Sequence, residues 1–179
     1  MYLEISGRQT GKTSRLVKAA AYAAIDTFLS DENRDIVVFG INKHEEKRIF
    51  YKIEYEVKSY IKIPSYLDPK YYHEIMRNVH LGNSNALYSY DKALLFYDEF
   101  DFYRGNVIPR YDGYYATTPK HIRKYLPRQL IGDDTLRDLI NLNDGKYAKH
   151  TPTFDYSNAN YTQEQFEVEY LGKWNSLGE

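Results

Sequence analysis

The first thirteen residues constrain the fold of this chain most strongly. Residues 2–13 read Tyr-Leu-Glu-Ile-Ser-Gly-Arg-Gln-Thr-Gly-Lys-Thr, a short and largely apolar run followed by a loop that contains glycines. The loop fits the phosphate-binding pattern G-x-x-x-x-G-K-[ST], except that Ser6 occupies the position of the first glycine. In such a loop the backbone N–H groups and the start of the next helix form an anion cradle. The sequence therefore predicts a strand, loop and helix that bind phosphate.

The residue types in this loop also predict individual roles. Lys12 is expected to reach the β- and γ-phosphates, and the hydroxyl of Thr13 is expected to ligate Mg²⁺. The other positions contribute their backbone N–H groups. We therefore predict that ATP or another nucleoside triphosphate binds here with Mg²⁺, at Ser6, Gly7, Arg8, Gln9, Thr10, Gly11, Lys12 and Thr13.

Composition limits the other possibilities. The chain has 179 residues, of which 42% are hydrophobic and 27% charged, and this fits one soluble globular domain with its own core. A formal net charge of −1 argues against a broadly basic protein that coats nucleic acid. The absence of cysteine excludes disulfides, thiolate zinc sites and cysteine nucleophiles. The sequence has neither a signal-like nor a membrane-spanning apolar run, so we expect a cytoplasmic protein without a membrane partner.

The hydrophobic pattern alternates between strands and helices. Helical spacing is found over residues 14–29 and 44–60, and a further short helix is expected over 66–80. Apolar runs at 35–41 and 92–97 are typical of strands buried on both faces of a parallel sheet. The predicted fold class is α/β: a three-layer P-loop NTPase, RecA/ASCE-like, with a mainly parallel central sheet. The 20 tyrosines are expected to fill the edges of the core rather than to stack on bases.

A second motif follows the apolar run at 92–97. Asp98 and Glu99 are adjacent carboxylates at the end of a predicted strand. Asp98 would hold Mg²⁺, directly or through water, and Glu99 would act as the general base on the attacking water. The alternative is an exposed acidic turn after a core strand. The phosphate loop upstream favours the catalytic interpretation, and a glutamate directly after the metal-binding aspartate suits hydrolysis.

A third motif lies at residues 112–119. It reads as a short strand that ends in two hydroxyl side chains, Thr117 and Thr118, followed by Pro119. Hydroxyls at the end of a neighbouring strand could sense the γ-phosphate and pass the change to a moving segment. A simple Thr-Pro turn is the alternative.

Taken in order, these motifs resemble the ATPase domain of the large terminase subunit, the DNA-packaging motor of tailed bacteriophages. Residues 6–13 are similar to the Walker A motif of that family, with Arg8 at the place of an arginine proposed to act on the γ-phosphate. Residues 94–99 look like its Walker B motif with the catalytic glutamate, and 116–119 look like its coupling motif. Residues 161–174 are similar to the Phe-x-x-Glu-Tyr-Leu-Gly-aromatic helix that closes the domain. The resemblance covers nearly the whole chain, although residues 43–90 contribute only order and length.

The resemblance implies a function and partners. It implies a Mg-dependent ATPase that couples hydrolysis to translocation of double-stranded DNA, with Glu99, Arg8 and Lys12 as catalytic residues. It also implies a homo-oligomeric ring on the portal of a procapsid in an infected host cell. Beyond the third motif, basic residues would contact DNA phosphates or reach into a neighbouring subunit, and a solvated basic face is the alternative. These residues are Lys120, His121, Arg123, Lys124 and Arg128.

The sequence also departs from the family pattern. Terminase large subunits usually carry a segment before Walker A that packs on the adenine, whereas here the first strand starts at Met1. They also carry a C-terminal nuclease. We therefore expect a single ATPase domain over 1–179, with about 145–179 as a C-terminal extension, without a nuclease domain and with a separate nuclease chain as a candidate partner. Two alternatives remain open: a nucleotide-dependent switch or assembly module with little hydrolysis of its own, and another P-loop enzyme such as a nucleoside kinase.

Overall fold

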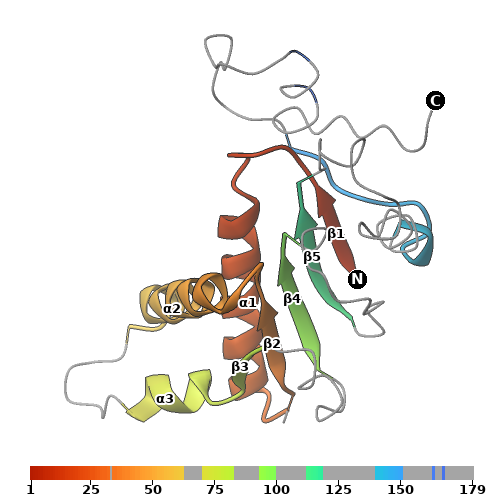
Figure 1. Cartoon of the computed structure of the whole chain (residues 1–179). Helices are drawn as coiled ribbons and strands as arrows, with labels where there is room; N and C mark the ends of the chain where they lie inside the picture. The colour runs from red at the N-terminus through yellow and green to blue at the C-terminus, as the bar shows by residue number, and fades with distance from the viewer. Residues whose placement is uncertain are drawn as a thin grey trace.

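The computed structural model describes residues 1–32, 34–62, 70–82, 93–99, 112–118 and 140–150, together with Gln163 and Glu167. Along these residues, strands and helices alternate up to the second helix, which is followed by a third helix and then by three strands (Figure 1). The elements are β1 (Tyr2–Ile5), α1 (Lys12–Leu29), β2 (Ile36–Phe39), α2 (Lys43–Tyr60), α3 (Lys70–Met76), β3 (Val79–Leu81), β4 (Leu94–Asp98) and β5 (Gly113–Thr117).

The strands form one five-stranded sheet in the order β1-β5-β4-β2-β3. Each neighbouring pair is parallel, so the carboxyl ends of the strands lie at the same edge. β5 lies between β1 and β4 and pairs with both of them. One strand, β5, therefore separates β1, which precedes the phosphate loop, from β4, which ends in Asp98.

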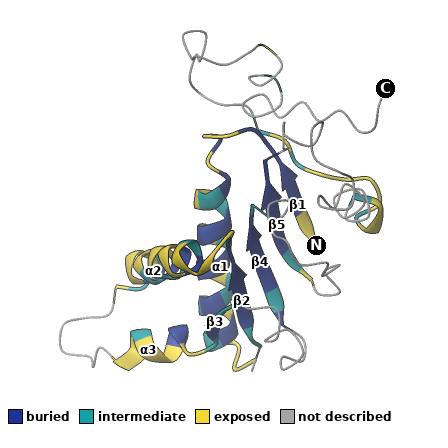
Figure 2. Cartoon of the chain, in the orientation of Figure 1, coloured by how far each residue is buried: buried dark blue, intermediate teal, exposed yellow. Residues whose placement is uncertain are grey.

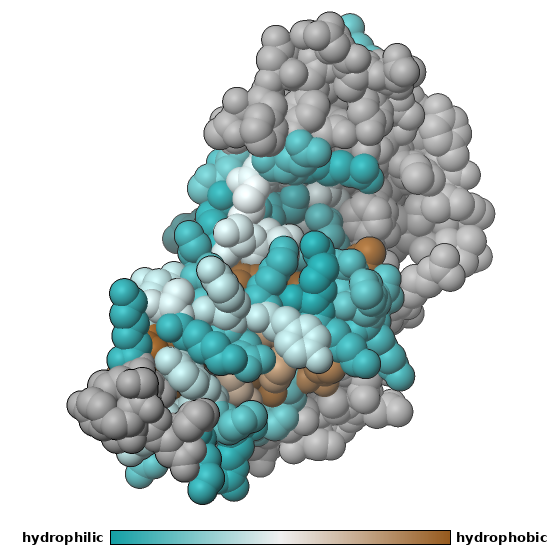
Figure 3. Space-filling model, turned by 90° about the vertical axis from the view of Figure 1, so that its left-hand side faces the viewer, coloured by the Kyte–Doolittle hydropathy of each residue, from teal (hydrophilic) through white to brown (hydrophobic). Residues whose placement is uncertain are grey.

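The helices α1, α2 and α3 cover one face of this sheet (Figure 1). α1 buries Leu16, Val17, Ala20 and Ala24 in a cluster with residues of α2 and the strands, and its small alanines let the helix lie close to the sheet (Figure 2). Figure 3 shows the side of the molecule that carries α2 and α3, which is mainly hydrophilic with small apolar areas between polar side chains. These helices are thus amphipathic, with their apolar sides against the sheet.

The other face of the sheet carries a second buried cluster. Its members are Leu3, Ile5, Val37, Phe39, Ala93, Leu95, Tyr97 and Tyr115, and Ile140 packs against it. The rings of Phe39 and Tyr97 are stacked with centroids 4.3 Å apart. Both faces of the central strands are therefore buried, as the continuous apolar runs at 35–41 and 92–97 predicted.

The structure corrects one predicted element. The helix expected over 66–80 is shorter: α3 ends at Met76, and Val79–Leu81 form the edge strand β3. Val79 pairs with Ile36 and His80 with Val37 of β2, and the His80 Nε2 atom lies 2.8 Å from Asp35 Oδ1. A short strand that gains its partners from residues more than 40 positions away leaves no signal in a local pattern.

The remaining elements agree with the predictions within the described residues. The α/β class and the parallel sheet are confirmed, and α1 begins at Lys12, directly after the loop. Of residues 161–174, which resemble the closing helix of the terminase ATPase domain, only Gln163 and Glu167 are described; both are helical, and Gln163 Nε2 donates to Glu167 Oε1 at 3.2 Å. The rest of this range lies outside the described residues. No described helix combines the length and the apolar character needed to cross a membrane.

Candidate nucleotide-binding site

The loop between β1 and α1 has the backbone geometry of an anion cradle. Gln9 and Gly11 have positive φ angles of 56° and 82°, and Gly11 directly precedes α1. Glycine adopts this conformation without the steric cost that other residues meet. The N-terminus of α1 has no side-chain cap, and its first turn contains no acidic residue. The helix therefore brings neither a capping side chain nor an acidic residue of its own to its positive end, which favours binding of an anion.

Lys12 connects this loop to the end of β4. Its side chain is buried, and Nζ donates a hydrogen bond to the Gly7 carbonyl at 2.7 Å and lies 3.7 Å from Glu99 Oε1. Thr10 Oγ1 donates to the same carbonyl at 2.9 Å. Burial lowers the pKa of Lys12, although the carboxylates of Glu99 and Asp98 act in the opposite direction. A cation is thus held at the centre of the loop.

Asp98 and Thr13 form the second contact between the loop and β4. Thr13 Oγ1 donates to Asp98 Oδ2 at 2.9 Å, while Asp98 Oδ1 is buried and has no hydrogen-bond partner among the described residues. Burial and the neighbouring Glu99 raise the pKa of Asp98 to about 6. Buried oxygen atoms are normally hydrogen-bonded or bound to metal, and hydroxyl and carboxylate oxygens are the ligands that Mg²⁺ prefers. Thr13 and Asp98 therefore fit a Mg²⁺ site.

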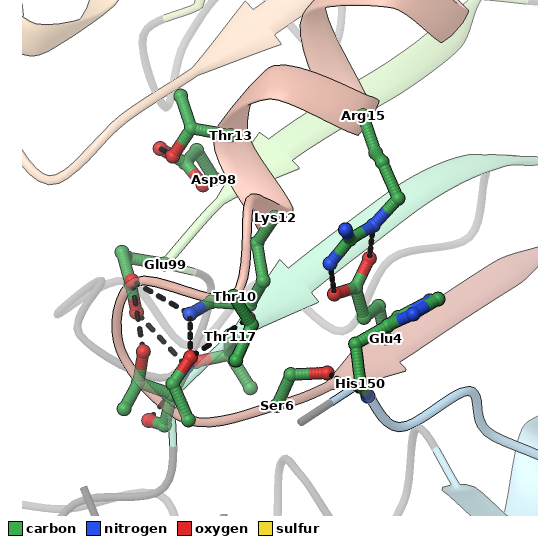
Figure 4. Close-up of polar contacts among 12 residues, drawn as sticks. Glu4, Ser6, Thr10, Lys12, Thr13, Arg15, Asp98, Glu99, Thr117 and His150 are labelled. Atoms are coloured by element: carbon green, nitrogen blue, oxygen red, sulfur yellow. Dashed lines mark hydrogen bonds and ion pairs between the residues drawn. The ribbon is translucent and has the colours of Figure 1, made fainter. Parts of the chain in front are cut away.

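Glu99 turns away from β4 towards the end of β5. Its φ angle is 51°, which is costly for a residue with a side chain. The carboxylate accepts a hydrogen bond from the Thr118 N–H at 2.9 Å and another from the Thr118 hydroxyl at 3.0 Å. Figure 4 shows Glu99 and Lys12 facing each other at the carboxyl edge of the sheet, with Thr117 nearby. The predicted general base and the predicted coupling segment are therefore in direct contact.

A buried ionic network next to the loop was not predicted. Glu4 of β1 is fully buried and accepts hydrogen bonds from Arg15 Nε at 3.1 Å, from a second nitrogen of the same guanidinium and from the Tyr114 hydroxyl at 2.8 Å. Burial alone would raise the pKa of Glu4, but these hydrogen bonds bring it below its usual range. A charged residue inside a short apolar strand was the signal that could have indicated this network.

Ser6, the departure from the glycine pattern, also has a partner. Its side chain is buried, and its Oγ accepts a hydrogen bond from the backbone N–H of His150 at 2.8 Å. The serine hydroxyl thus attaches a distant part of the chain to the start of the loop. A glycine at this position could not make this contact.

The structure brings most of the predicted site residues together. The loop residues 6–13, Asp98, Glu99, Thr117 and Thr118 meet at the carboxyl edge of β1, β4 and β5. Arg8 is exposed on the loop, and its catalytic role stays a prediction. Pro119 and the basic residues Lys120, His121, Arg123, Lys124 and Arg128 lie outside the described residues.

No family model, curated protein or solved structure matches this chain. The fold and the site geometry define it as an α/β protein with an all-parallel sheet and a glycine-containing loop beside two strand-end carboxylates.

Proposed function

We propose that this protein is a Mg-dependent P-loop ATPase of the RecA/ASCE-like class. One observation carries the proposal: the loop and the end of β4 meet at one edge of the sheet, where Thr13 bonds Asp98, 85 positions away, and Lys12 lies next to Glu99. A cation, an uncapped helix N-terminus and two carboxylates are the groups that Mg-nucleotide binding and hydrolysis need. An accidental acidic turn after β4 would not require both contacts with the loop.

The geometry supports a specific role for each group. The phosphates would lie over the N-terminus of α1, and Lys12 would exchange the Gly7 carbonyl for phosphate oxygen. Thr13 and Asp98 would hold Mg²⁺, which when bound neutralises charge on the phosphates. Glu99 would accept the proton of the attacking water, since its carboxylate would lie beside the terminal phosphate of a nucleotide bound at the loop. Arg8 would approach the same phosphate from the exposed side of the loop.

The contact between Thr118 and Glu99 supports coupling to movement. Thr118, which holds the carboxylate with two groups, directly follows β5, so a shift of Thr117 and Thr118 would change the position of Glu99. Hydrolysis at Glu99 and the position of this segment would then depend on each other. This link is what a motor needs between its reaction and the element that moves its substrate.

We further propose that the motor acts on double-stranded DNA, as a terminase-type packaging ATPase does. The proposal rests on the order of the motifs at 6–13, 94–99 and 116–119 and on the basic residues that follow them. It includes a ring of subunits on a procapsid portal in the infected cell. Because a ring neighbour would complete each site, weak activity is expected from the monomer.

A nucleotide-dependent switch with little turnover is the second candidate. Its support is the resting arrangement of the site, in which Lys12 is bonded to Gly7 and Glu99 is bonded twice to Thr118. Such a site would bind nucleotide and change shape without efficient hydrolysis.

Steady-state ATP hydrolysis separates the two candidates. Wild-type protein and Glu99→Gln are compared with Mg²⁺, with and without double-stranded DNA, over a range of protein concentrations. The motor predicts turnover that rises with DNA and protein concentration and falls by at least about 100-fold in the variant, as expected for loss of a general base. Nucleotide binding by both proteins without turnover under any condition would favour the switch.

A further inference from the structure

A segment distant in sequence lies along the outer edge of β1. The backbone N–H of Ala148 donates to the Leu3 carbonyl at 2.8 Å, and the Ile5 N–H donates to the Ala148 carbonyl at 2.9 Å. The segment ends at the hydrogen bond between the His150 N–H and Ser6 Oγ. Residues 146–150, the edge segment, are thus held against β1 at Ala148 and against the first residue of the phosphate loop at His150.

The register of this pairing assigns its side chains to faces of the sheet. Ala148 pairs in parallel with Glu4, so the two side chains point to the same face. That face carries α1, because Arg15 of α1 bonds Glu4. Alternation along the extended backbone from Ala148 assigns His150, two residues further on, to this face and Tyr147 to the opposite one. Figure 4 shows His150 next to Glu4, on the side of the loop where Arg15 lies.

Glu4 and His150 lie on the opposite side of the loop from Asp98 and Glu99, where hydrolysis is proposed to occur (Figure 4). Along the edge of the sheet, the order runs from Asp98 on β4 across β5 and β1 to the edge segment. The phosphate loop follows β1 and therefore lies between Asp98 and the edge segment. A nucleotide with its terminal phosphate at Asp98 and Glu99 would run along this loop. Its nucleoside would then reach the side that Arg15, Ala148 and His150 form.

The chemistry of this side suits a flat and uncharged group. The guanidinium of Arg15 is one-third exposed, is fixed by two hydrogen bonds to Glu4, and has its charge balanced by that carboxylate. It also lies close to the loop, since a Cβ on Gly11 would approach Arg15 Nη1 to 3.1 Å. A neutralised guanidinium attracts a further phosphate poorly but stacks well on an aromatic ring. Ala148 is small, and the imidazole of His150 is a second flat surface.

We propose that Arg15, Ala148 and His150 form the subsite for the base of the bound nucleotide. The inference rests on the proposed function, because the phosphate loop places the nucleotide. It assigns base recognition to the edge segment, which comes after the site residues in the chain, rather than to a segment before the loop.

The test compares a ligand that has a base with one that has none. Calorimetry measures the affinity of the full chain for the Mg complexes of a non-hydrolysable ATP analogue and of inorganic tripolyphosphate. His150→Ala should weaken binding of the ATP analogue by about tenfold, the scale of one lost stacking contact, and should leave tripolyphosphate binding within about twofold. His150→Phe, which keeps a flat ring, should restore most of the affinity. Tyr147→Ala, an aromatic deletion on the opposite face, should change neither ligand.

The possible failures are distinguishable. If the wild-type chain binds both ligands and His150→Ala weakens both equally or neither, the base subsite is wrong while the phosphate site stands. An effect of Tyr147→Ala equal to that of His150→Ala also overturns the subsite. If the wild-type chain binds neither ligand, the proposed function fails and the subsite fails with it. Circular dichroism of each variant shows whether the fold is retained.

Discussion

Thr118 holds the carboxylate of Glu99 with two hydrogen bonds, one from its backbone N–H at 2.9 Å and one from its hydroxyl at 3.0 Å. In this position Glu99 has a φ angle of 51°, in the left-handed region that is costly for a residue with a side chain. The strained backbone and the double contact hold the proposed base against the end of β5. This arrangement connects the reaction site to the segment that would transmit its state.

Replacement of Thr118 by valine tests this connection. Thr118→Val removes the hydroxyl and keeps the backbone N–H, so Glu99 is released in part. We expect basal ATP turnover to rise by up to about tenfold and stimulation by DNA to shrink, because a hydrogen bond to a charged group contributes roughly 1.5–3 kcal/mol. The matched control is Thr27→Val, which removes the hydroxyl of a buried threonine on α1. Lower basal turnover in folded Thr118→Val would mean that the resting contact already positions Glu99 for reaction.

The buried pair of Glu4 and Arg15 predicts a large effect on stability. Arg15→Met leaves the Glu4 carboxylate fully buried with its main partner lost. Breaking such a pair costs about 3–5 kcal/mol, and the partial exposure of Arg15 reduces our expectation to about 2–4 kcal/mol. Urea unfolding measures the loss. Arg48→Met, which removes an exposed pair with Glu45, should cost less than about 1 kcal/mol. Equal losses in the two variants would contradict a stabilising role for the Glu4 network.

The buried carboxylate of Asp98 is expected to lower the stability of the fold and to be required for Mg-dependent hydrolysis. Its pKa is raised to about 6 by burial and by Glu99, so the folded state binds its proton more tightly than the unfolded state does. The stability of the wild type therefore decreases as the pH rises from about 4 to about 6, and the cost is complete above that. Asp98→Asn should raise the free energy of unfolding at pH 8 by about 1–3 kcal/mol and lose Mg-dependent hydrolysis. The gain should vanish near pH 4. A variant that is less stable at pH 8 would contradict this assignment.

Comparing Gly11→Ala with Gly145→Ala distinguishes the effect of backbone strain on stability from an effect on anion binding. Gly11→Ala and Gly145→Ala both place a side chain at a positive φ, 82° and 73°, and should each lose about 1–2 kcal/mol of stability. At Gly11 the new Cβ would approach Arg15 Nη1 to 3.1 Å, whereas at Gly145 it would meet no described group within 4 Å. We expect tripolyphosphate binding to weaken in Gly11→Ala alone. Equal binding by the two variants would show that the loop geometry does not matter for the anion.

The sequence predicted the parts of this molecule that local patterns encode. The loop before Lys12, the apolar run that ends at Asp98 and the helix of α1 each have a signal within about ten neighbouring residues. Because parallel strands place their carboxyl ends at one edge, the meeting of Lys12, Asp98 and Glu99 also followed from the predicted fold.

Contacts between distant segments were beyond such patterns. β3 owes its conformation to pairing with β2, and the same residues read locally as the end of a helix. Ser6 looked like a tolerated departure from glycine until its bond with His150 gave it a role. The partners of Glu4 come from α1 and β5, and only the folded chain brings them together.

The most direct test of the account is binding of a non-hydrolysable Mg-ATP analogue, measured by calorimetry with wild-type protein, Lys12→Ala and Lys18→Ala. Lys18 is an exposed lysine on the same helix and controls for the loss of a charge. We predict Mg-dependent binding that falls by about a hundredfold in Lys12→Ala, the scale of a charged hydrogen bond, and is unchanged in Lys18→Ala. No binding by the wild-type chain, or equal binding by all three proteins, would contradict a nucleotide site at this loop.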